Sequence, residues 1–329
     1  MANFKDIIGQ DNIKKHLQTG ITQGNISHAY IINGETGSGR RLLASALTKT
    51  LLCENPTAEG DACGKCRSCL QADSYNHPDV CFVTHEKASI SVDDIREQLI
   101  NSITIKPYSS RYKVYIIPDA NKMTGQAQNA LLKTIEEPPE YAVIILLTEN
   151  ADTLLETVRS RCIVLNTRPL NRDEIKQYLV NNLQMEPERA EIAAGFCQGN
   201  VGKAIHFASS EDFQEIKTDT LRLVKNIYDM DITDMVSLIK ELNQRKGKID
   251  EYLDLMLLWY RDILMFKVTK DANILLYREE YKEISRQASL RNYEDIENII
   301  KAIDKAKVRL HANVNFETAI ELLLLAIKE

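Results

Sequence analysis

Five short apolar runs alternate with helix-like stretches through the first half of the chain, and this order constrains the fold more than any other feature. The runs are rich in valine and isoleucine and mostly lack apolar–polar alternation, which is typical of strands buried on both faces of a parallel sheet. Strands that alternate with helices predict an α/β module. The predicted strands cover residues 29–32, 80–84, 114–117, 143–148 and 162–165.

Helix signals fill the intervals between these strands. Ser91 with Asp94 matches a capping box, the pattern that opens many helices. Residues 126–136 have a helical pattern, which the pair Pro138-Pro139 ends. Both predicted helices lie between predicted strands, as the α/β order requires.

The strand signal stops after the fifth run, and the rest of the chain has helical periodicity. Asn171 with Glu174 is a second capping box. We therefore predict three domains: an α/β module over 1–167, a small helical lid over 168–208 and an all-helical domain over 209–329. The apolar faces of the last domain suit an oligomerising collar, but they equally suit an internal core.

Composition excludes several classes of function. Hydrophobic residues make up 44% of the chain, so it should bury real cores. The net charge of −6 and the pI of about 5.7 argue against an autonomous DNA-binding protein. The first residues lack the pattern of a signal peptide, and no apolar stretch reaches the ~18 residues of a membrane span. We expect a soluble, cytoplasmic protein.

Four cysteines have the spacing of a metal site. Cys53, Cys63, Cys66 and Cys69 read C-x9-C-x2-C-x2-C, and in a reducing compartment clustered thiols indicate a metal rather than disulfides. Four thiolates are the ligand set of a structural Zn²⁺ site. An iron–sulfur cluster is the rival, but its run needs a further cysteine followed by proline; four free thiols are the plainest alternative. The other cysteines, Cys81, Cys162 and Cys197, lie in apolar surroundings and are expected in cores.

The stretch NGETGSGRRLL, residues 33–43, is nearly a phosphate-binding loop. Gly34 and Gly39 have the spacing of a P-loop, whose backbone N–H groups hold phosphates at a helix N-terminus. Arg40 replaces the lysine; it can contact phosphate but does not fill a lysine's place. Arg41 replaces the hydroxyl that binds Mg²⁺, and its charge repels the ion. The alternative is a plain turn, but the strand–loop–helix order favours a P-loop.

The second Mg²⁺ position of a P-loop ATPase can be checked independently. An Asp, often followed by Glu, should follow an apolar strand. Here Pro118 stands at the position of the metal-supporting Asp, and Asp119 stands at the position of the Glu. Because two separate places lose the metal, we predict a site without productive ATP and Mg²⁺.

Longer stretches carry a resemblance to a known family. TGQAQNALLKTIEEPPEYAVIILLTEN and TLLETVRSRC closely resemble clamp-loader subunits of the AAA+ class. FKDIIGQDNIKKHL, HAYIINGETGSG, the cysteine spacing, LLWYRDIL and ANVNFETAIELLLLAI are similar to the same family, so the resemblance covers nearly the whole chain.

The resemblance implies a ring subunit that acts on another subunit's ATP. In this family the Ser160-Arg161-Cys162 motif supplies an arginine finger in trans, and a guanidinium beside a γ-phosphate stabilises the transition state. A short helix is predicted from about Asp152, so Arg161 has a plainer interpretation as a cation at a helix C-terminus, and Arg159 is a neighbouring confounder. The resemblance also implies a heteropentameric ring with gamma or tau and delta subunits, which loads a sliding clamp on primer-template DNA for a replicative DNA polymerase.

Two further positions concern the ATP site within this chain. Gly202, followed by Lys203, stands where the family has a nucleotide-sensing arginine, and Thr148 matches its polar sensor. The leading hypothesis is therefore a non-hydrolysing ring subunit with no catalytic activity of its own. An active, gamma-like ATPase is the alternative, and a zinc-bearing nucleic-acid adaptor is the third.

Overall fold

The structure, a computed structural model, describes residues 1–209, 212–312 and 314–328. It divides into two compact units, Met1–His206 and Phe207–Glu329. The predicted division into three domains stays a prediction, and its last residue, 329, lies outside the described residues, as do 210, 211 and 313. No helix in the described part of the chain is long and apolar enough to cross a bilayer.

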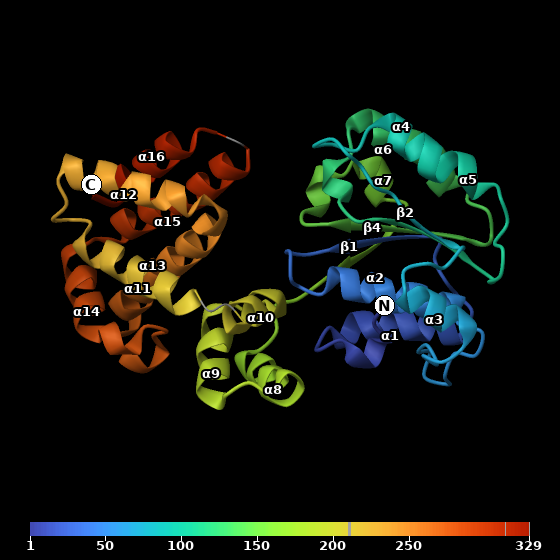
Figure 1. Cartoon of the computed structure of the whole chain (residues 1–329), viewed down its shortest axis with the longest axis horizontal. Helices are drawn as coiled ribbons and strands as arrows, with labels where there is room; N and C mark the ends of the chain where they lie inside the picture. Colours follow the sequence, from blue (N-terminus) through green and yellow to red (C-terminus); the bar gives the residue numbers. More distant parts are fainter. Residues whose placement is uncertain (210–211, 313, 329) are drawn as a thin grey trace. The chain divides into compact units, whose positions relative to one another are not determined.

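The first unit contains a five-stranded parallel sheet in the order β2-β3-β4-β1-β5 (Figure 1). The predicted α/β fold class is confirmed, and each predicted strand is present within two residues at either end. The strands are β1 Ala29–Asn33, β2 Val80–Phe82, β3 Lys113–Ile117, β4 Ala142–Thr148 and β5 Ile163–Asn166.

Helices cover both faces of this sheet. Figure 1 shows α1, α2 and α3 on one face and α4 to α7 on the other. Alternate residues of a strand serve the two cores: Ile31 packs with α4–α7, whereas Ile32 packs with α1 and α2. This double burial explains why the strands read as continuous apolar runs. The helices are η1 Phe4–Asp6, α1 Asp11–Thr22, α2 Arg40–Leu52, α3 Arg67–Asp73, α4 Val92–Ile95, η2 Arg96–Ile100, α5 Asn101–Ile103, η3 Ala120–Lys122, α6 Gly125–Glu136, η4 Ala151–Thr153 and α7 Glu156–Arg159.

Local signals set several of these boundaries. Ser91 and Asp94 form the predicted capping box at α4. The short helix before Ser160 was expected from about Asp152, and this is wrong. Asp152 lies in the 3-10 turn η4, and α7 begins only at Glu156 because the buried Leu154 has an extended backbone that breaks the helix.

Three helices follow the sheet: α8 Arg172–Leu183, α9 Pro187–Phe196 and α10 Val201–Ser209. Asn171 and Glu174 form the predicted capping box of α8. The first turn of α10 contributes to the pocket described below.

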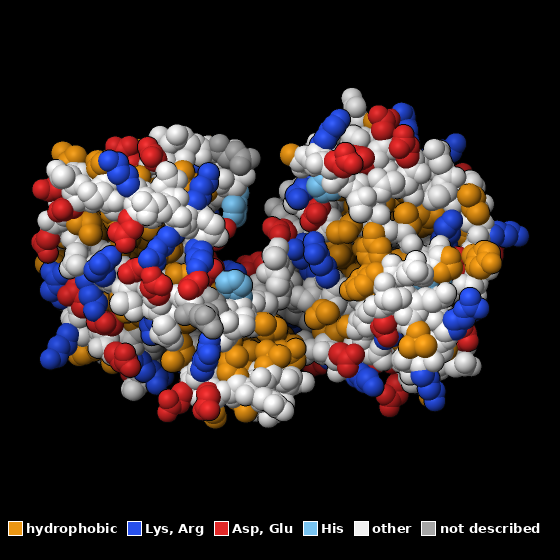
Figure 2. Space-filling model, in the orientation of Figure 1, with side chains coloured by type: hydrophobic (Ala, Val, Ile, Leu, Met, Phe, Trp, Pro, Cys, Tyr) orange, Lys and Arg blue, Asp and Glu red, His pale blue; other side chains and the backbone are white. Residues whose placement is uncertain are grey.

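The described part of the second unit is helical, as predicted. Its central helix α13 carries Trp259 and Tyr260, both fully buried, and the Trp259 indole donates to Gln287 at 3.2 Å. Charged side chains of both signs spread over its surface (Figure 2). Leu322 and Leu325 are 45% and 43% exposed, so part of the apolar surface of α16 remains outside the core. The helices are α11 Phe213–Asn226, α12 Ile232–Gln244, η5 Lys246–Lys248, α13 Ile249–Thr269, η6 Ala272–Ile274, η7 Arg278–Glu280, α14 Tyr281–Leu290, α15 Tyr293–His311 and α16 Phe316–Lys328.

Candidate functional site

The glycine loop joins β1 to α2 at the carboxyl edge of the sheet. Gly34, Gly37 and Gly39 have φ values of 154°, 87° and 95°, and Gly39 is the N-cap of α2. Because α2 begins at Arg40, the N–H groups of its first turn have no helical partners and point out of the helix end. The backbone therefore has the strand–loop–helix arrangement of a phosphate-binding loop.

A pocket of about 340 Å³ lies against this loop. Its walls come from four separate parts of the first unit. They are residues near the start of the chain (Asp6, Ile7, Ile8), the loop and the start of α2 (Thr36 to Leu42), the ends of β3 and β4 (Pro118, Asp119, Leu147) and the helices after the sheet (Tyr178, Val201, Gly202, Ile205). Both apolar and polar side chains line the pocket, a mixture that is typical of small-molecule sites.

The two arginines of the loop behave differently. The Arg40 guanidinium donates to Thr36 Oγ1 at 3.2 Å and to Glu149 Oε1 at 3.3 Å, so it is held to one side by a carboxylate. Arg41 is exposed at the pocket. Neither position offers the hydroxyl or carboxylate oxygen that Mg²⁺ prefers.

The end of β3 is equally poor in metal ligands. Pro118 lines the pocket and has no side-chain donor atom. The Asp119 carboxylate lies 3.7 Å from Lys122 Nζ and 3.6 Å from His85 Nε2. Asp119 therefore has cationic and imidazole neighbours inside the chain.

The helices after the sheet close directly on the glycine loop. The N–H of Gly202 donates to the Gly37 carbonyl at 3.0 Å, and Asn200 Nδ2 donates to the Thr36 carbonyl at 2.8 Å. A Cβ atom on Gly202 would lie 2.5 Å from the Gly37 Cα atom, closer than atoms can approach. The missing side chain at Gly202 is thus what allows the contact, and an arginine there would separate the two backbones.

Sequence reasoning missed Asn200. Its side chain also accepts from the N–H of Lys203 at 3.1 Å, so it caps the first turn of α10. An Asn just before a helix is a recognisable capping signal, but nothing near it in the sequence indicates the contact with Thr36. Thr148, the predicted sensor, is buried and donates to the Asn150 carbonyl at 2.9 Å, which satisfies its hydroxyl within the turn.

Arg161 lies two residues after the end of α7, next to the C-cap residue Ser160. Its guanidinium pairs with Glu136 Oε1 at 2.8 Å and donates to the Thr157 carbonyl at 2.9 Å. Its side chain is 39% exposed. Arg159 instead pairs with Asp152 at 2.5 Å, so the two neighbouring arginines have different acidic partners. Sequence reasoning missed Glu136, which the helix end of α6 brings to Arg161.

The other members of the motif differ in exposure. Ser160 is exposed and its hydroxyl donates to the Thr157 carbonyl at 3.2 Å. Cys162 packs against the core on the α4–α7 face, and burial raises its pKa to about 12. Its thiol is therefore protonated and inert at neutral pH. Burial likewise raises the pKa of Cys81 and of Cys197, in keeping with their expected place in cores.

The four clustered cysteines converge as predicted. All four sulfur atoms lie within 4.8 Å of one another, and Cys53 to Cys66 and Cys63 to Cys69 are 3.9 Å apart. Tetrahedral zinc with bonds of ~2.3 Å requires sulfur atoms ~3.8 Å apart, so the geometry fits. A hydrogen bond from the Lys65 N–H lowers the pKa of Cys63 to about 6, whereas burial raises the pKa of Cys69. Backbone N–H groups thus already stabilise one thiolate.

Three comparisons bear on this architecture. Residues 9–171 match the family model described as DNA polymerase III, delta subunit. The delta' subunit of DNA polymerase III from Bacillus subtilis is 31% identical over 97% of this chain and 96% of that protein. The tau subunit of the same organism is 27% identical over 96% of this chain and 60% of its own length. A gamma-subunit-related protein from Thermotoga maritima covers 97% of this chain and 98% of its own, with 20% identity and a TM-score of 0.48.

A parallel sheet with a glycine loop at its carboxyl edge, followed by helices, is the architecture of a P-loop-type α/β protein. The sequence identity to the delta' subunit extends over nearly the full length of both proteins and so defines the family within this class. The chain belongs to the DNA polymerase III delta' family of clamp-loader subunits.

Proposed function

We propose that this chain is a non-hydrolysing subunit of a clamp-loader ring and donates Arg161 to the ATP of a neighbouring gamma or tau subunit. In the cytoplasm, together with gamma or tau and delta subunits, it helps to load the sliding clamp onto primed DNA. The observation that supports the proposal is the pocket at the glycine loop, where Arg41 and Pro118 line the wall instead of the Mg²⁺ ligands that the motif requires and Gly202 closes on Gly37.

Charge supports the loss of hydrolysis. ATP hydrolysis needs a cation that bridges the β- and γ-phosphates and a carboxylate that orients water. Arg41 adds positive charge where the metal would bind, and Asp119 is already near Lys122 and His85. Phosphate contact by Arg40 would first require it to leave Glu149.

Exposure supports Arg161 as the group that acts in trans. An exposed ion pair such as that with Glu136 contributes only about 0–1 kcal/mol, so Arg161 can exchange its partner for a phosphate at small cost. The hydrogen bond that Arg161 donates to the Thr157 carbonyl orients the guanidinium. In a site that excludes water, a guanidinium beside the γ-phosphate is worth orders of magnitude in rate.

We also propose that the cysteine cluster holds a structural Zn²⁺. Four thiolates leave no open coordination position, so the metal would supply folding free energy rather than catalysis. The N–H groups of Cys63, Cys66 and Cys69 donate to the sulfur atoms of the cluster at 3.3–3.4 Å, and these bonds would stabilise the bound thiolates.

The second unit is proposed to be the oligomerising collar. The half-exposed Leu322 and Leu325 on α16 support an intersubunit surface there. Size-exclusion chromatography with the partner subunits tests this: the variant Leu322→Lys with Leu325→Lys should fail to co-elute with them. Co-elution at wild-type affinity would remove α16 from the interface.

Arg161→Ala tests the function directly. The variant should fold as the wild type does, but the DNA-stimulated ATPase of the reconstituted loader should fall, by about tenfold or more at the interface that Arg161 serves. Arg159→Ala is the matched control and should keep the rate. The variant Arg161→Lys keeps the positive charge but lacks the planar guanidinium, so its ATPase rate shows which of the two properties matters. An unchanged rate in Arg161→Ala would exclude the finger.

The second candidate function is an ATP-hydrolysing motor, the role that this proposal gives to gamma and tau. The sequence similarity of this chain to the tau subunit favours it. It requires Mg²⁺-dependent phosphate release by the isolated chain. Calorimetry with ATP and an ATPase assay, alone and with partner subunits, distinguish the two. Turnover by the isolated chain that Arg41→Ala alters would establish the motor.

A further inference from the structure

Residues 3–10, here called the N-terminal segment, form one wall of the loop pocket. Asp6, Ile7 and Ile8 line the pocket. Phe4 and Ile7 are 1% and 3% exposed and pack into the core formed with α1 and α2. The position of this segment therefore sets the shape of the pocket on that side.

One end of the N-terminal segment is bound to the cysteine knuckle, residues 53–69. The Asp61 carboxylate accepts from the N–H groups of Phe4 and Lys5 at 3.1 and 3.2 Å. Asn3 Nδ2 donates to the Ala62 carbonyl at 3.0 Å. Asp61 and Ala62 directly precede Cys63, and Asp61 is only 7% exposed.

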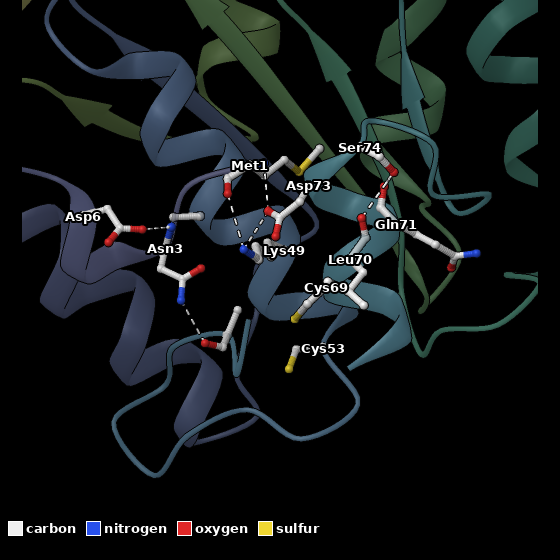
Figure 3. A network of polar contacts seen from close by, with 12 residues as sticks. Met1, Asn3, Asp6, Lys49, Cys53, Cys69, Leu70, Gln71, Asp73 and Ser74 are labelled. Carbon is white, nitrogen blue, oxygen red and sulfur yellow. Dashed lines mark hydrogen bonds and ion pairs between the residues drawn. The ribbon is translucent and has the colours of Figure 1, made fainter. Parts of the chain in front are cut away.

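The helix that carries Cys69 makes a second contact with the start of the chain (Figure 3). The Asp73 carboxylate accepts from the Met1 amino group at 2.9 Å and from Lys49 Nζ at 2.7 Å. Lys49, itself 4% exposed, also donates to the Met1 carbonyl at 3.3 Å. Residues 1–5 are thus contacted both by the knuckle, through Asp61 and Ala62, and by the end of α3 that follows it, through Asp73.

The far end of the N-terminal segment is bound to the chain between the sheet and α8. Gln10 Nε2 donates to the Arg168 carbonyl at 2.7 Å, and the Arg168 N–H donates back to Gln10 Oε1 at 3.0 Å. The pocket wall at residues 6–8 therefore lies between two fixed points. Between these points, Lys14 Nζ donates to the Ile7 carbonyl at 3.0 Å.

We propose that the cysteine knuckle holds the pocket wall in place, with Asp61 as the positioning residue, so that metal occupancy sets the mobility of residues 3–10. The apolar cluster of the knuckle is small, with Cys53, Ala62 and Cys69 as its buried members. A loop with so little core depends on its metal for a fixed conformation. Asp61 lies two residues before the proposed ligand Cys63, and its hydrogen bonds fix Phe4 and Lys5 when the knuckle is fixed.

Hydrogen exchange of the intact chain, followed by mass spectrometry, tests the inference. Asp61→Ala should speed exchange in peptides that cover residues 3–10 by at least about tenfold. The reason is that the hydrogen bonds from two backbone N–H groups to a buried carboxylate are lost. Wild-type protein treated with a zinc chelator should show the same change, and added Zn²⁺ should reverse it. Peptides from β3 and β4 report global unfolding and should stay protected.

Glu59→Ala, an exposed change in the same loop, is the matched control and should exchange at the wild-type rate. If Asp61→Ala does not fold, Asn3→Ala removes the bond to Ala62 and tests the same contact. Wild-type exchange at residues 3–10 in either the chelated protein or the Asp61 variant would overturn the proposal. The inference rests on the proposed Zn²⁺, and elemental analysis of the same sample separates absence of the metal from failure of the inference. The outcome is independent of Arg161, since no ATPase rate enters the measurement.

Discussion

The Gly202 N–H donates a hydrogen bond of 3.0 Å to the Gly37 carbonyl, and the two glycines approach so closely that neither tolerates a side chain at the contact. Gly37 belongs to the glycine loop before α2, and Gly202 belongs to the first turn of α10. The backbone of α10 therefore closes directly over the loop at the position where the sequence resemblance implies a nucleotide-sensing arginine.

Gly202→Ala should destabilise the first unit by about 1–3 kcal/mol, because the added methyl group overlaps Gly37 and forces the backbones apart. Urea unfolding gives the value. Gly125→Ala is the control: nothing lies within 4 Å of that position in the first turn of α6, so alanine should be neutral or slightly stabilising. Equal stability of the two variants would contradict a closed contact.

Glu136→Gln should change stability by less than about 0.5–1 kcal/mol, because the Arg161 pair is exposed to solvent. In the reconstituted loader the ATPase rate should stay near wild type, since Thr157 still orients Arg161. The neighbouring Glu137→Gln controls for the loss of one charge. A large ATPase loss in Glu136→Gln alone would mean that Glu136 itself belongs to the trans site.

Purified protein should contain one zinc per chain by elemental analysis. Cys69→Ser should lose the metal and unfold at lower temperature, because three thiolates hold Zn²⁺ less tightly than four. Cys81→Ser should retain it, since Cys81 lies outside the cluster and its thiol donates to the Gln98 carbonyl. Iron absorption in the visible range, or full zinc in Cys69→Ser, would refute the assignment.

Asp79 should make folding sensitive to acid. Burial alone would raise its pKa, but the N–H groups of Tyr108, Ser109 and Ser110 outweigh burial and lower it below the usual 3.8. The stabilisation is complete above that value and disappears as pH falls through the lower folded-state pKa. Asp79→Asn should therefore cost about 1.5–3 kcal/mol at pH 7, and the difference should shrink below about pH 4.

The control for this change is Asp93→Asn, an exposed residue in the first turn of α4. Unfolding curves between pH 3 and 7 give both series. A difference between wild type and Asp79→Asn that stays constant across this range would show that the charge of Asp79 does not act through these bonds.

Much of the fold was predictable because its signals are local. Apolar runs gave five strands, and two capping boxes gave the starts of α4 and α8. The spacing of Cys63, Cys66 and Cys69 predicted a convergent cluster, because residues in one tight turn cannot be far apart. The predicted start of α7, at about Asp152, was wrong because burial of Leu154 overrides the helical pattern there.

The sequence by itself determined the residue types: a glycine loop without Mg²⁺ ligands, four clustered thiols, and Arg161 at a helix end. Only the tertiary structure decided their partners. Gly37 meets Gly202, Arg161 meets Glu136 and Phe4 meets Asp61 across long stretches of sequence. The physical reason is that strand and cap signals act between neighbours along the chain, whereas these contacts arise only when the packing of sheet and helices brings distant segments together.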